Sequence, residues 1–390
     1  MRLAILASHP IQYQVPLFRE LAKRCELKVF YCWNFGVEPQ HDIEFGRAVQ
    51  WDVPMLDGYE HEFLPNLAKD KGTHRFFGLL NPAIVMRLRA WRADAVVVHG
   101  YAHATEMLVL MATAAHHTPL LMRCDGSLLG QRRAWVLKAK EFVIPAIFQR
   151  LSGALVAGTR NREYFVHYGL PAEKLFFAPY SVDNAFFSTQ SEQARRDAMQ
   201  WRTDLGILSD EKAVVFAAKL VAKKGCGDLI RAFGSIDANR GALIIVGDGP
   251  LRADLERLAG QYPRHRIVFA GFANQSRMPS AYAMGDVFAL PSWNEPWGLA
   301  VNEAMCLGLP IIASDTVGAA IDLVGPDNGW VYRTGDVRAL RDALKDALSD
   351  PDALRKKGAA SAEKIQAWDV PQTADGFLAA ARACSLGRQI

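Results

Sequence analysis

Short apolar runs alternate with helix-like segments along both halves of the chain, and this alternation constrains the fold more than any other feature. The first half has such runs at residues 3–7 and 94–99, and the second half has them at 213–220 and 242–250. Each run is followed by a turn and a helical pattern, which is typical of buried parallel strands. The sequence therefore predicts an α/β fold with two Rossmann-like, doubly wound domains that face a central cleft.

A chain of 390 residues is too long for one ordinary core, so two domains are expected. The stretch 188–202 is polar and charged and lacks a strand pattern, which indicates a boundary nearby. We expect a first domain over residues 1–185 and a second over 186–368. A C-terminal helix within 369–390 is expected to cross back onto the first domain.

Composition narrows the class of protein. The formal net charge is only +4, from 45 basic and 41 acidic residues, so we expect no nucleic-acid partner. The six cysteines form no C-x-x-C pair and no metal-ligand spacing, which favours free thiols and no metal site. No apolar run approaches the ~20 residues that span a bilayer, and the first ten residues do not form a cleavable signal. We therefore expect a cytoplasmic location.

Residues 131–150 combine basic and apolar side chains. Five basic residues oppose one acidic residue there, and bulky apolar residues interleave with them. A basic amphipathic segment of this kind fits an anionic membrane surface, which would make the protein peripheral on the inner face of the cytoplasmic membrane. The alternative is a solvated helix face over the domain core, with Pro145 kinking or restarting the helix.

The stretch NEPWGLAVNEAM, residues 294–305, combines two carboxylates with a predicted helix start. Glu295 lies in the loop after a predicted buried strand, and Glu303 lies in the second turn of the helix that begins near Gly298. Amides at a helix start, here those of Gly298 and Leu299, can receive a phosphate group. The alternative is structural: Glu295 caps the helix and Glu303 pairs with a neighbouring cation.

Two lysines follow the first strand of the second domain. Lys219 ends the run at 213–220, and Lys224 lies in the turn after it. Two ammonium groups at the carboxyl end of a strand suit a diphosphate and a departing nucleotide. The alternative is that they only solubilise the surface. The nearby GDGP turn lacks the full dinucleotide fingerprint, and there is no P-loop.

Two residues of the first half are candidates for acceptor chemistry. His9 lies in the loop 8–14 after the first strand, and Asp125 follows the strand at 119–123. Ligands of doubly wound domains bind outside the carboxyl ends of the strands, so both residues are expected near a ligand. The alternative for His9 is that it caps the turn. For His99 and His103 we slightly favour a packing role over a ligand-binding one.

The second domain resembles that of glycosyltransferase family 4, whose members are retaining enzymes with two Rossmann-like domains, the GT-B fold. The resemblance covers most of residues 214–332. It rests on the order and spacing of AKLVAKKGCGDLIRAF, VGDGPLRADLERL, VFAGF, DVFALPSWNEPWGLAVNEAMCLGLPIIASD and GWVY. The first half is similar more loosely, through GTRNREYFVHYGL and PYSVDN.

The resemblance implies that the first domain binds the acceptor and the second binds the donor. Glu295 would contact the hydroxyls of the donor sugar near the reacting face, and Glu303 would bind the ribose hydroxyls. The other implied donor-binding residues are Lys219, Lys224, Gly298 and Leu299 at the diphosphate, and Gly271 and Phe272 at the base. No bound metal and no cofactor is implied, because the nucleotide sugar is itself the substrate.

This chain departs from the family pattern at three places. Lys219 stands where the family usually has Arg, and an ammonium cannot form a bidentate fork. Asp125 stands where the family often has His, and a carboxylate there is able to orient the acceptor hydroxyl or accept its proton. In place of a Gly-rich acceptor loop the chain has SHPIQYQ, so His9 and Gln12 would replace backbone contacts.

Together these features predict a retaining, metal-independent glycosyltransferase of the hexosyltransferase type. It would move a sugar from a nucleotide-sugar donor to a glycan or lipid-linked acceptor, and the family association is with surface-polysaccharide biosynthesis. Two alternatives stay open. One is a sugar-nucleotide epimerase of the same architecture, and the other is a non-catalytic nucleotide-sugar-binding protein.

Overall fold

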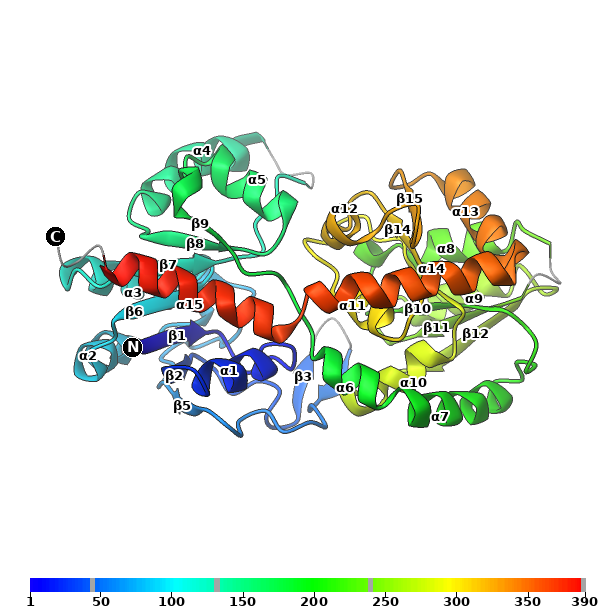
Figure 1. The fold of residues 1–390 in the computed structure, drawn as a ribbon, viewed down its shortest axis with the longest axis horizontal. Helices are drawn as coiled ribbons and strands as arrows, with labels where there is room; N and C mark the ends of the chain where they lie inside the picture. The colour runs from blue at the N-terminus through cyan, green and yellow to red at the C-terminus, as the bar shows by residue number, and fades with distance from the viewer. Residues whose placement is uncertain (43–45, 130–133, 238–240, 387–390) are drawn as a thin grey trace. The chain divides into compact units, whose positions relative to one another are not determined.

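The computed structural model describes residues 1–42, 46–129, 134–237 and 241–386, and the chain divides into two compact units (Figure 1). The first unit contains Met1–Gln40, Pro54–Tyr180 and Val370–Ile390, and the second contains His41–Val53 and Ser181–Asp369. The sequence analysis placed the corresponding crossings after residues 185 and 368. None of the helices in the described ranges is both long and apolar enough to cross a membrane.

The described part of the first unit contains a seven-stranded parallel sheet. In spatial order its strands are β5 (Glu60–Phe63), β2 (Glu26–Tyr31), β1 (Arg2–Ala7), β6 (Ala95–His99), β7 (Leu120–Arg123), β8 (Gly153–Val156) and β9 (Leu175–Phe177). The sequence order reverses between β1 and β6. This reversal is the switch point at which ligands of doubly wound sheets bind.

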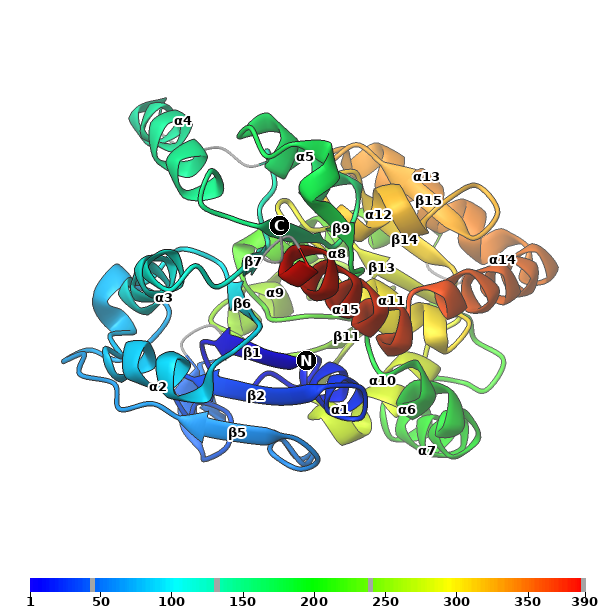
Figure 2. The same ribbon diagram turned by 60° about the vertical axis from the view of Figure 1, so that its left-hand side comes forward.

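Helices cover both faces of the first sheet, because its central strands are apolar on both sides. One face carries α1 (Val15–Ala22) and α15 (Val370–Leu386), which lie side by side in Figures 1 and 2. The other face carries α2 (Ala83–Trp91), α3 (Ala104–Ala115), α4 (Ala134–Phe148) and α5 (Thr159–His167). The short helices are η1 (Phe76–Gly78) and η2 (Ala172–Lys174).

The C-terminal helix returns to the first unit. Thr373 at its start donates its hydroxyl to the carbonyl of Pro179 at 2.9 Å. The buried guanidinium of Arg123 donates to the carbonyls of Ala178 and Pro179 at 3.1 and 3.2 Å, and it lies over the ring of Phe377. These contacts fix the first half of α15 to residues 178–179, near the point where the chain leaves the first unit.

The described part of the second unit contains a six-stranded parallel sheet. In spatial order its strands are β12 (Arg266–Gly271), β11 (Ala242–Val246), β10 (Ala213–Ala217), β13 (Val287–Leu290), β14 (Ile311–Ser314) and β15 (Gly329–Tyr332). The switch point of this sheet lies between β10 and β13. The prediction of two doubly wound α/β domains is confirmed.

Helices cover both faces of the second sheet as well. The apolar core on one face includes side chains of α8 (Cys226–Phe233), α9 (Arg252–Ala259) and α13 (Val337–Ser349). The other face contacts α10 (Met278–Ala283) and α11 (Leu299–Cys306). The remaining helices are α6 (Asn184–Thr189), α7 (Ser191–Asp204), α12 (Gly318–Leu323), α14 (Pro351–Lys364), η3 (Ala222–Lys224), η5 (Gln275–Arg277) and η6 (Ile365–Ala367).

Residues 41–53, which we call the strap, lie with the second unit although the chain on both sides of them belongs to the first. The sequence analysis assigned this segment to the first domain. The strap contains part of β3 (Gln40–Asp42) and all of β4 (Arg47–Val49), which pair with each other. Polar contacts to the second unit, given below, account for the difference.

The amphipathic segment expected at 131–150 is helical from Ala134, and residues 131–133 lie outside the described part of the chain. Pro145 lies inside α4, so the helix does not restart at that proline, and the expected kink stays a prediction. The amide of Gln149 still donates to the carbonyl of Pro145 at 2.9 Å. The helix therefore continues past the proline with its hydrogen-bonding pattern resumed.

Candidate active site

The loop after β10 carries both predicted phosphate-binding lysines. The amide of Leu220 donates to the carbonyl of Asp248 at 2.9 Å, and the amide of Leu251 donates to the carbonyl of Leu220 at 3.1 Å. Gly249 makes this approach possible, because a Cβ atom there would lie only 2.8 Å from the carbonyl oxygen of Leu220. The GDGP turn thus packs against the lysine loop and fixes its backbone.

Glu295 lies in the loop after β13, and its carboxylate forms an ion pair with the ammonium of Lys224. The two side chains are only 14% and 18% exposed, so the pair is largely shielded from water. The hydroxyl of Ser292 donates to the same carboxylate oxygen at 3.4 Å. The structure therefore brings together two residues that the sequence analysis assigned to the donor sugar and the diphosphate.

Backbone contacts explain why these two loops meet. The amide of Trp293 donates to the carbonyl of Lys223 at 2.8 Å, and its indole N–H donates to Asp228 at 2.8 Å. Gly225 has a positive φ of 68°, and a Cβ atom there would lie 2.0 Å from the carbonyl oxygen of Pro291. Only glycine permits this closeness, so the loops after β10 and β13 are locked together.

The helix α11 begins at Leu299, directly after Gly298, as predicted. Gly298 has a φ of 97°, and a Cβ atom there would lie 3.1 Å from Glu295, Leu290 and Val317. Within the described residues, no side chain caps this helix start. The alternative in which Glu295 caps the helix is therefore wrong: its carboxylate contacts Lys224 instead.

Glu303 lies on the inner part of α11 and accepts a hydrogen bond of 2.6 Å from the hydroxyl of Tyr282. Burial raises the pKa of Glu303 from 4.5 to about 7, and the bonds from Tyr282 and Gln275 partly offset that rise. A carboxyl group with this pKa exists in both protonation states near neutral pH. The alternative in which Glu303 pairs with a neighbouring cation is wrong, because its hydrogen-bond partners among the residues that the structure describes, Tyr282 and Gln275, are neutral.

Gly271 and Phe272 lie at the carboxyl end of β12. The carbonyl of Gly271 accepts a hydrogen bond of 2.8 Å from the amide of Gly247, at the start of the GDGP turn. Gly271 has a φ of 78°, which bends the chain out of the sheet at this point. The predicted base-binding segment therefore leaves the sheet beside the turn that supports the lysine loop.

His9 and Asp125 belong to the first unit. His9 follows β1 and packs edge-on against Trp33 and Phe35, with its Nδ1 atom 3.0 Å from the hydroxyl of Ser8. The exposed residue Asp125 follows β7, and its carboxylate accepts a hydrogen bond from the hydroxyl of Tyr180. His9 thus borders the switch point of the first sheet, whereas Asp125 lies one strand beyond β6.

A further pair at the same switch point was not given a functional role by the sequence. The side-chain amide of Gln14 donates to Nδ1 of His99 at 3.0 Å. Burial and the nearby Arg123 lower the pKa of His99 to about 3, so the ring is neutral and carries its proton on Nε2. His99 Nε2 and Gln14 Oε1 are buried and have no hydrogen-bond partner among the described residues. By contrast, His103 has its Nδ1 atom 3.0 Å from Glu106, which agrees with the packing role expected for it.

Sequence reasoning also missed Asp42, Tyr282 and Ser292. Ser292 stands three positions before Glu295, so its contact with that carboxylate is local in the sequence. Asp42 and Tyr282 contact site residues that are far away in the sequence, 177 and 21 positions respectively. No local pattern around either residue announces those contacts.

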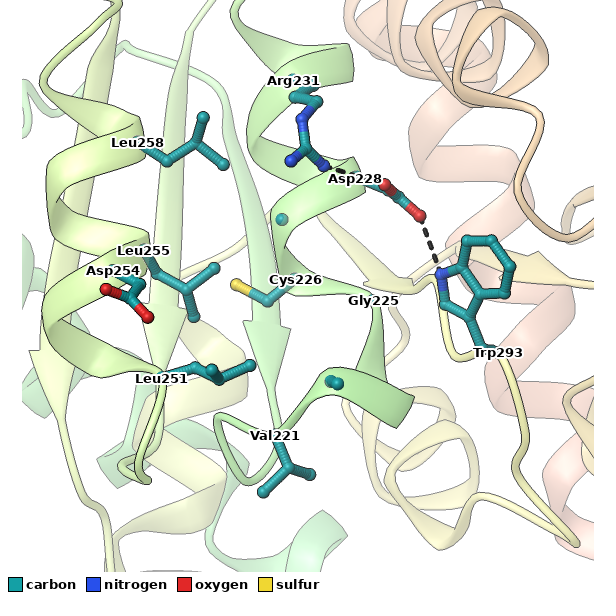
Figure 3. Close-up of a pocket in the computed structure, with 12 residues that line it drawn as sticks. Val221, Gly225, Cys226, Asp228, Arg231, Leu251, Asp254, Leu255, Leu258 and Trp293 are labelled. Atoms are coloured by element: carbon teal, nitrogen blue, oxygen red, sulfur yellow. Dashed lines mark hydrogen bonds and ion pairs between the residues drawn. The ribbon is translucent and has the colours of Figure 1, made fainter.

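A separate pocket of about 350 Å³ lies between α8 and α9 (Figure 3). Its wall is mainly apolar, with Leu251, Leu255 and Leu258 on one side, and Asp228 at its border holds both Trp293 and Arg231. None of the predicted donor-binding residues lines it. Val221, Gly225 and Trp293, from the loops after β10 and β13, form part of its border, so the pocket adjoins these loops but does not contain Lys224 or Glu295.

Comparisons with known proteins agree with this geometry. Residues 197–364 match the family described as glycosyl transferases group 1, and all the predicted donor-binding residues lie within this range. An uncharacterised glycosyltransferase from Methanocaldococcus jannaschii is 36% identical over 140 residues, which cover 35% of this chain and 36% of that protein. The chain therefore spans about a third of the length of that relative.

A longer match comes from Mycobacterium tuberculosis. Its GDP-mannose-dependent α-(1-6)-phosphatidylinositol monomannoside mannosyltransferase is 28% identical over 305 residues, which cover 75% of this chain and 78% of that protein. Among solved structures, Anabaena HepE in complex with UDP superimposes with a TM-score of 0.77 at 18% identity, covering 98% of this chain and all of that one. The chain thus has the GT-B fold, and residues 197–364 of its second unit are similar to group 1 glycosyl transferases.

Proposed function

We propose that this protein is a retaining, metal-independent glycosyltransferase that moves a sugar from a nucleotide-sugar donor to a hydroxyl of a glycan or lipid-linked acceptor. The observation that carries the proposal is the Lys224–Glu295 pair, which stands between the loops after β10 and β13. These two strands flank the switch point of the second sheet, where doubly wound domains bind their ligands. The group 1 glycosyltransferase match over the same residues supports it.

The donor would bind through the residues of the second unit. The ammonium groups of Lys219 and Lys224, together with the amides of Gly298 and Leu299, would neutralise the diphosphate and stabilise it as it departs. Glu303 would bind the ribose hydroxyls, and the backbone at Gly271 and Phe272 would frame the base. The relatives include a GDP-mannose-dependent enzyme and a structure with bound UDP, so the base is left to experiment.

Glu295 would act on the sugar. Its carboxylate is held by Lys224 and Ser292, so its position is set before the donor arrives. When the diphosphate binds, Lys224 turns to a stronger anion and Glu295 is left to contact the sugar hydroxyls near the reacting carbon. We propose that the acceptor hydroxyl attacks from the face that the diphosphate leaves, so that the anomeric configuration is retained.

The acceptor would bind at the switch point of the first unit. We propose that His9 and Asp125 contact the acceptor, with Gln12 and the Gln14–His99 pair beside them. His99 Nε2–H is a donor and Gln14 Oε1 an acceptor, and both are buried without a partner in the described part of the chain. A neutral, hydroxyl-bearing ligand satisfies both kinds of group at once.

We also propose that α4 rests on the anionic inner face of the cytoplasmic membrane. Trp135 and Phe142 are 66% and 80% exposed, seven positions apart on one side of the helix, with Lys138 between them. Ile144 and Phe148 on the opposite side are buried in the unit. An exposed row of aromatic and basic side chains suits the interface of a bilayer that carries a lipid-linked acceptor, and hence a role in surface-polysaccharide assembly.

The test is a screen of UDP-, GDP-, ADP- and dTDP-sugars by titration calorimetry, followed by product analysis in buffer with EDTA. Release of a nucleoside diphosphate without metal supports the transferase. Conversion to another nucleotide sugar without release supports the epimerase alternative. Binding without either reaction, even with added polyprenyl-phosphate or glycan acceptors, supports the non-catalytic alternative.

A further inference from the structure

The described residues of the strap contact the rest of the second unit at two points, and both lie at the carboxyl edge of its sheet. At one end Asp42 pairs with Lys219, which follows β10, with oxygen to nitrogen distances of 3.0 and 3.3 Å. At the other end the side-chain amide of Asn274 donates to the carbonyl of Gln50 at 2.8 Å. Asn274 follows β12, so the strap spans the ends of three neighbouring strands, β10, β11 and β12.

The second attachment is reinforced by a carboxylate. Asp52 accepts hydrogen bonds from the amide and the hydroxyl of Ser276, the amide bond being 3.0 Å long. Ser276 lies in η5, directly after the segment proposed to frame the base. The described contacts of the strap therefore include an ion pair with a phosphate-binding lysine and hydrogen bonds with neutral polar atoms.

We propose that the carboxylate of Asp42 competes with the donor diphosphate for the ammonium of Lys219 and so weakens the binding of phosphate-bearing ligands. The proposal rests on the donor-binding role given to Lys219 above and extends it. In the absence of a donor, Asp42 supplies the negative charge that Lys219 needs. The side chains of Asp42 and Lys219 are 14% and 26% exposed. The ion pair is therefore partly shielded from water, so replacing the carboxylate by a diphosphate changes the binding free energy.

The competition acts on one class of ligand, those that carry phosphate groups. A nucleoside diphosphate brings at least two negative charges and repays the loss of the Asp42–Lys219 pair when it displaces the carboxylate. A nucleoside brings none, and it leaves the pair intact. Asp42 thereby weakens the binding of every phosphate-bearing ligand while leaving nucleoside binding unaffected, so it lowers the discrimination between the two.

The test compares Asp42→Asn with wild type in the binding of UDP, GDP, uridine and guanosine by titration calorimetry. Asparagine keeps the size of the side chain and removes the competing charge. We expect the variant to bind its preferred nucleoside diphosphate about three- to tenfold more tightly, in the range of a partly buried ion pair. Binding of the matching nucleoside should not change.

Asp52→Asn is the matched control. It changes a carboxylate of the same strap that contacts Ser276 rather than a phosphate-binding cation. If this change loosens the strap, it should alter nucleoside and nucleoside diphosphate binding by the same factor. A Lys219→Ala background completes a double-mutant cycle, in which Asp42→Asn should no longer tighten diphosphate binding.

The outcomes separate the inference from the proposed function. Tighter diphosphate binding in Asp42→Asn that disappears in the Lys219→Ala background supports the inference. Unchanged or weaker diphosphate binding in Asp42→Asn, with wild type binding normally, overturns it, since Asp42 would then orient Lys219 rather than compete for it. If wild type binds none of UDP, GDP, ADP and dTDP, the proposed function is contradicted. The inference is then contradicted as well, because it rests on that function.

Discussion

Lys224 and Glu295 form an ion pair that joins the loops after β10 and β13, the two strands between which the second sheet reverses its order. Backbone contacts hold the two side chains together as well as their charges do. Gly225 lets its loop contact Pro291, and the amide of Trp293 donates a hydrogen bond to the carbonyl of Lys223. A cation and a carboxylate are thus held ready at the place where a doubly wound domain binds its ligand. The predictions below test what each part of this arrangement does.

Lys224→Met should weaken the binding of a nucleoside diphosphate by about ten- to a hundredfold, because a charge-assisted contact to phosphate is lost. Lys212→Met is the matched control. Lys212 lies just before β10, at the opposite end of the same strand, and pairs with Asp286 at 3.0 Å. Titration calorimetry should show normal nucleotide binding for the control. Equal losses in both variants would mean that the effect comes from general charge and not from the site.

Gly298→Ala should destabilise the protein and also impair donor binding. Its backbone has a φ of 97°, and the new methyl group would lie 3.1 Å from the side chains of Glu295, Leu290 and Val317. Gly169→Ala is the control. It introduces the same backbone strain, because Gly169 has a φ of 87°, but no steric clash, because nothing lies within 4 Å of the added carbon.

We expect a loss of about 1 kcal/mol in unfolding free energy for Gly169→Ala and about 2–4 kcal/mol for Gly298→Ala. Urea unfolding measures both losses. Donor affinity should fall about tenfold only in Gly298→Ala, because the displaced group is Glu295. Normal donor binding in a folded Gly298→Ala protein would show that this glycine serves the fold alone.

Glu303 should make stability depend on pH. Burial raises its pKa from 4.5 to about 7 in the folded protein, so between these values the folded state holds a proton that the unfolded chain has lost. The contribution of Glu303 to stability is therefore present below pH 4.5 and falls as the pH rises to about 7. Compared with Glu303→Gln, wild type should lose about 1–3 kcal/mol of unfolding free energy across this range.

Urea midpoints of wild type and Glu303→Gln at pH 5 and pH 7.5 measure this difference. The variant is its own control for the other groups that titrate in the same range, including the histidines. Parallel pH profiles for the two proteins would contradict the raised pKa. Glu303→Gln should also weaken nucleoside binding, because an amide cannot accept from both ribose hydroxyls as a carboxylate does.

Asp125→Asn tests the acceptor side. If the carboxylate orients or deprotonates the acceptor hydroxyl, kcat should fall at least tenfold while donor affinity stays normal. Tyr180→Phe is the control, because it removes the hydroxyl that bonds Asp125 and leaves the carboxylate in place. A smaller loss is expected for this control. Unchanged turnover in Asp125→Asn would assign the residue a structural role.

The strands and helices were largely predictable because the buried strands coincide with continuous apolar runs in the sequence. The run expected at residues 3–7 is β1, and that expected from residue 213 is β10, since strands buried on both faces tolerate few polar residues. The start of α11 was placed correctly because Gly298 marks it. The structural alternatives for Glu295 and Glu303, a helix cap and an ion pair respectively, were wrong because both depend on which residues lie nearby in space.

The strap shows the limit most clearly. Asp42 contacts Lys219 across 177 positions of sequence, and no propensity or periodicity near residue 42 distinguishes that aspartate from a solvent-exposed one. The Gln14–His99 pair was missed for a similar reason, because its two members meet only where β1 and β6 lie side by side. Contacts between distant segments depend on how the strands are ordered in the sheet. The pattern of apolar residues predicts the fold class, but it does not predict which distant residues meet.

The most direct test of the central claim is the release of nucleoside diphosphate from the donor that wild type binds best. The assay compares wild type with Glu295→Gln, with Glu192→Gln on the exposed surface of α7 as the matched control. The account predicts release by wild type and by the control, and a loss of about a hundredfold or more in Glu295→Gln with donor binding retained. Undiminished release by Glu295→Gln, or no release by wild type from any nucleotide sugar with any acceptor, would contradict it.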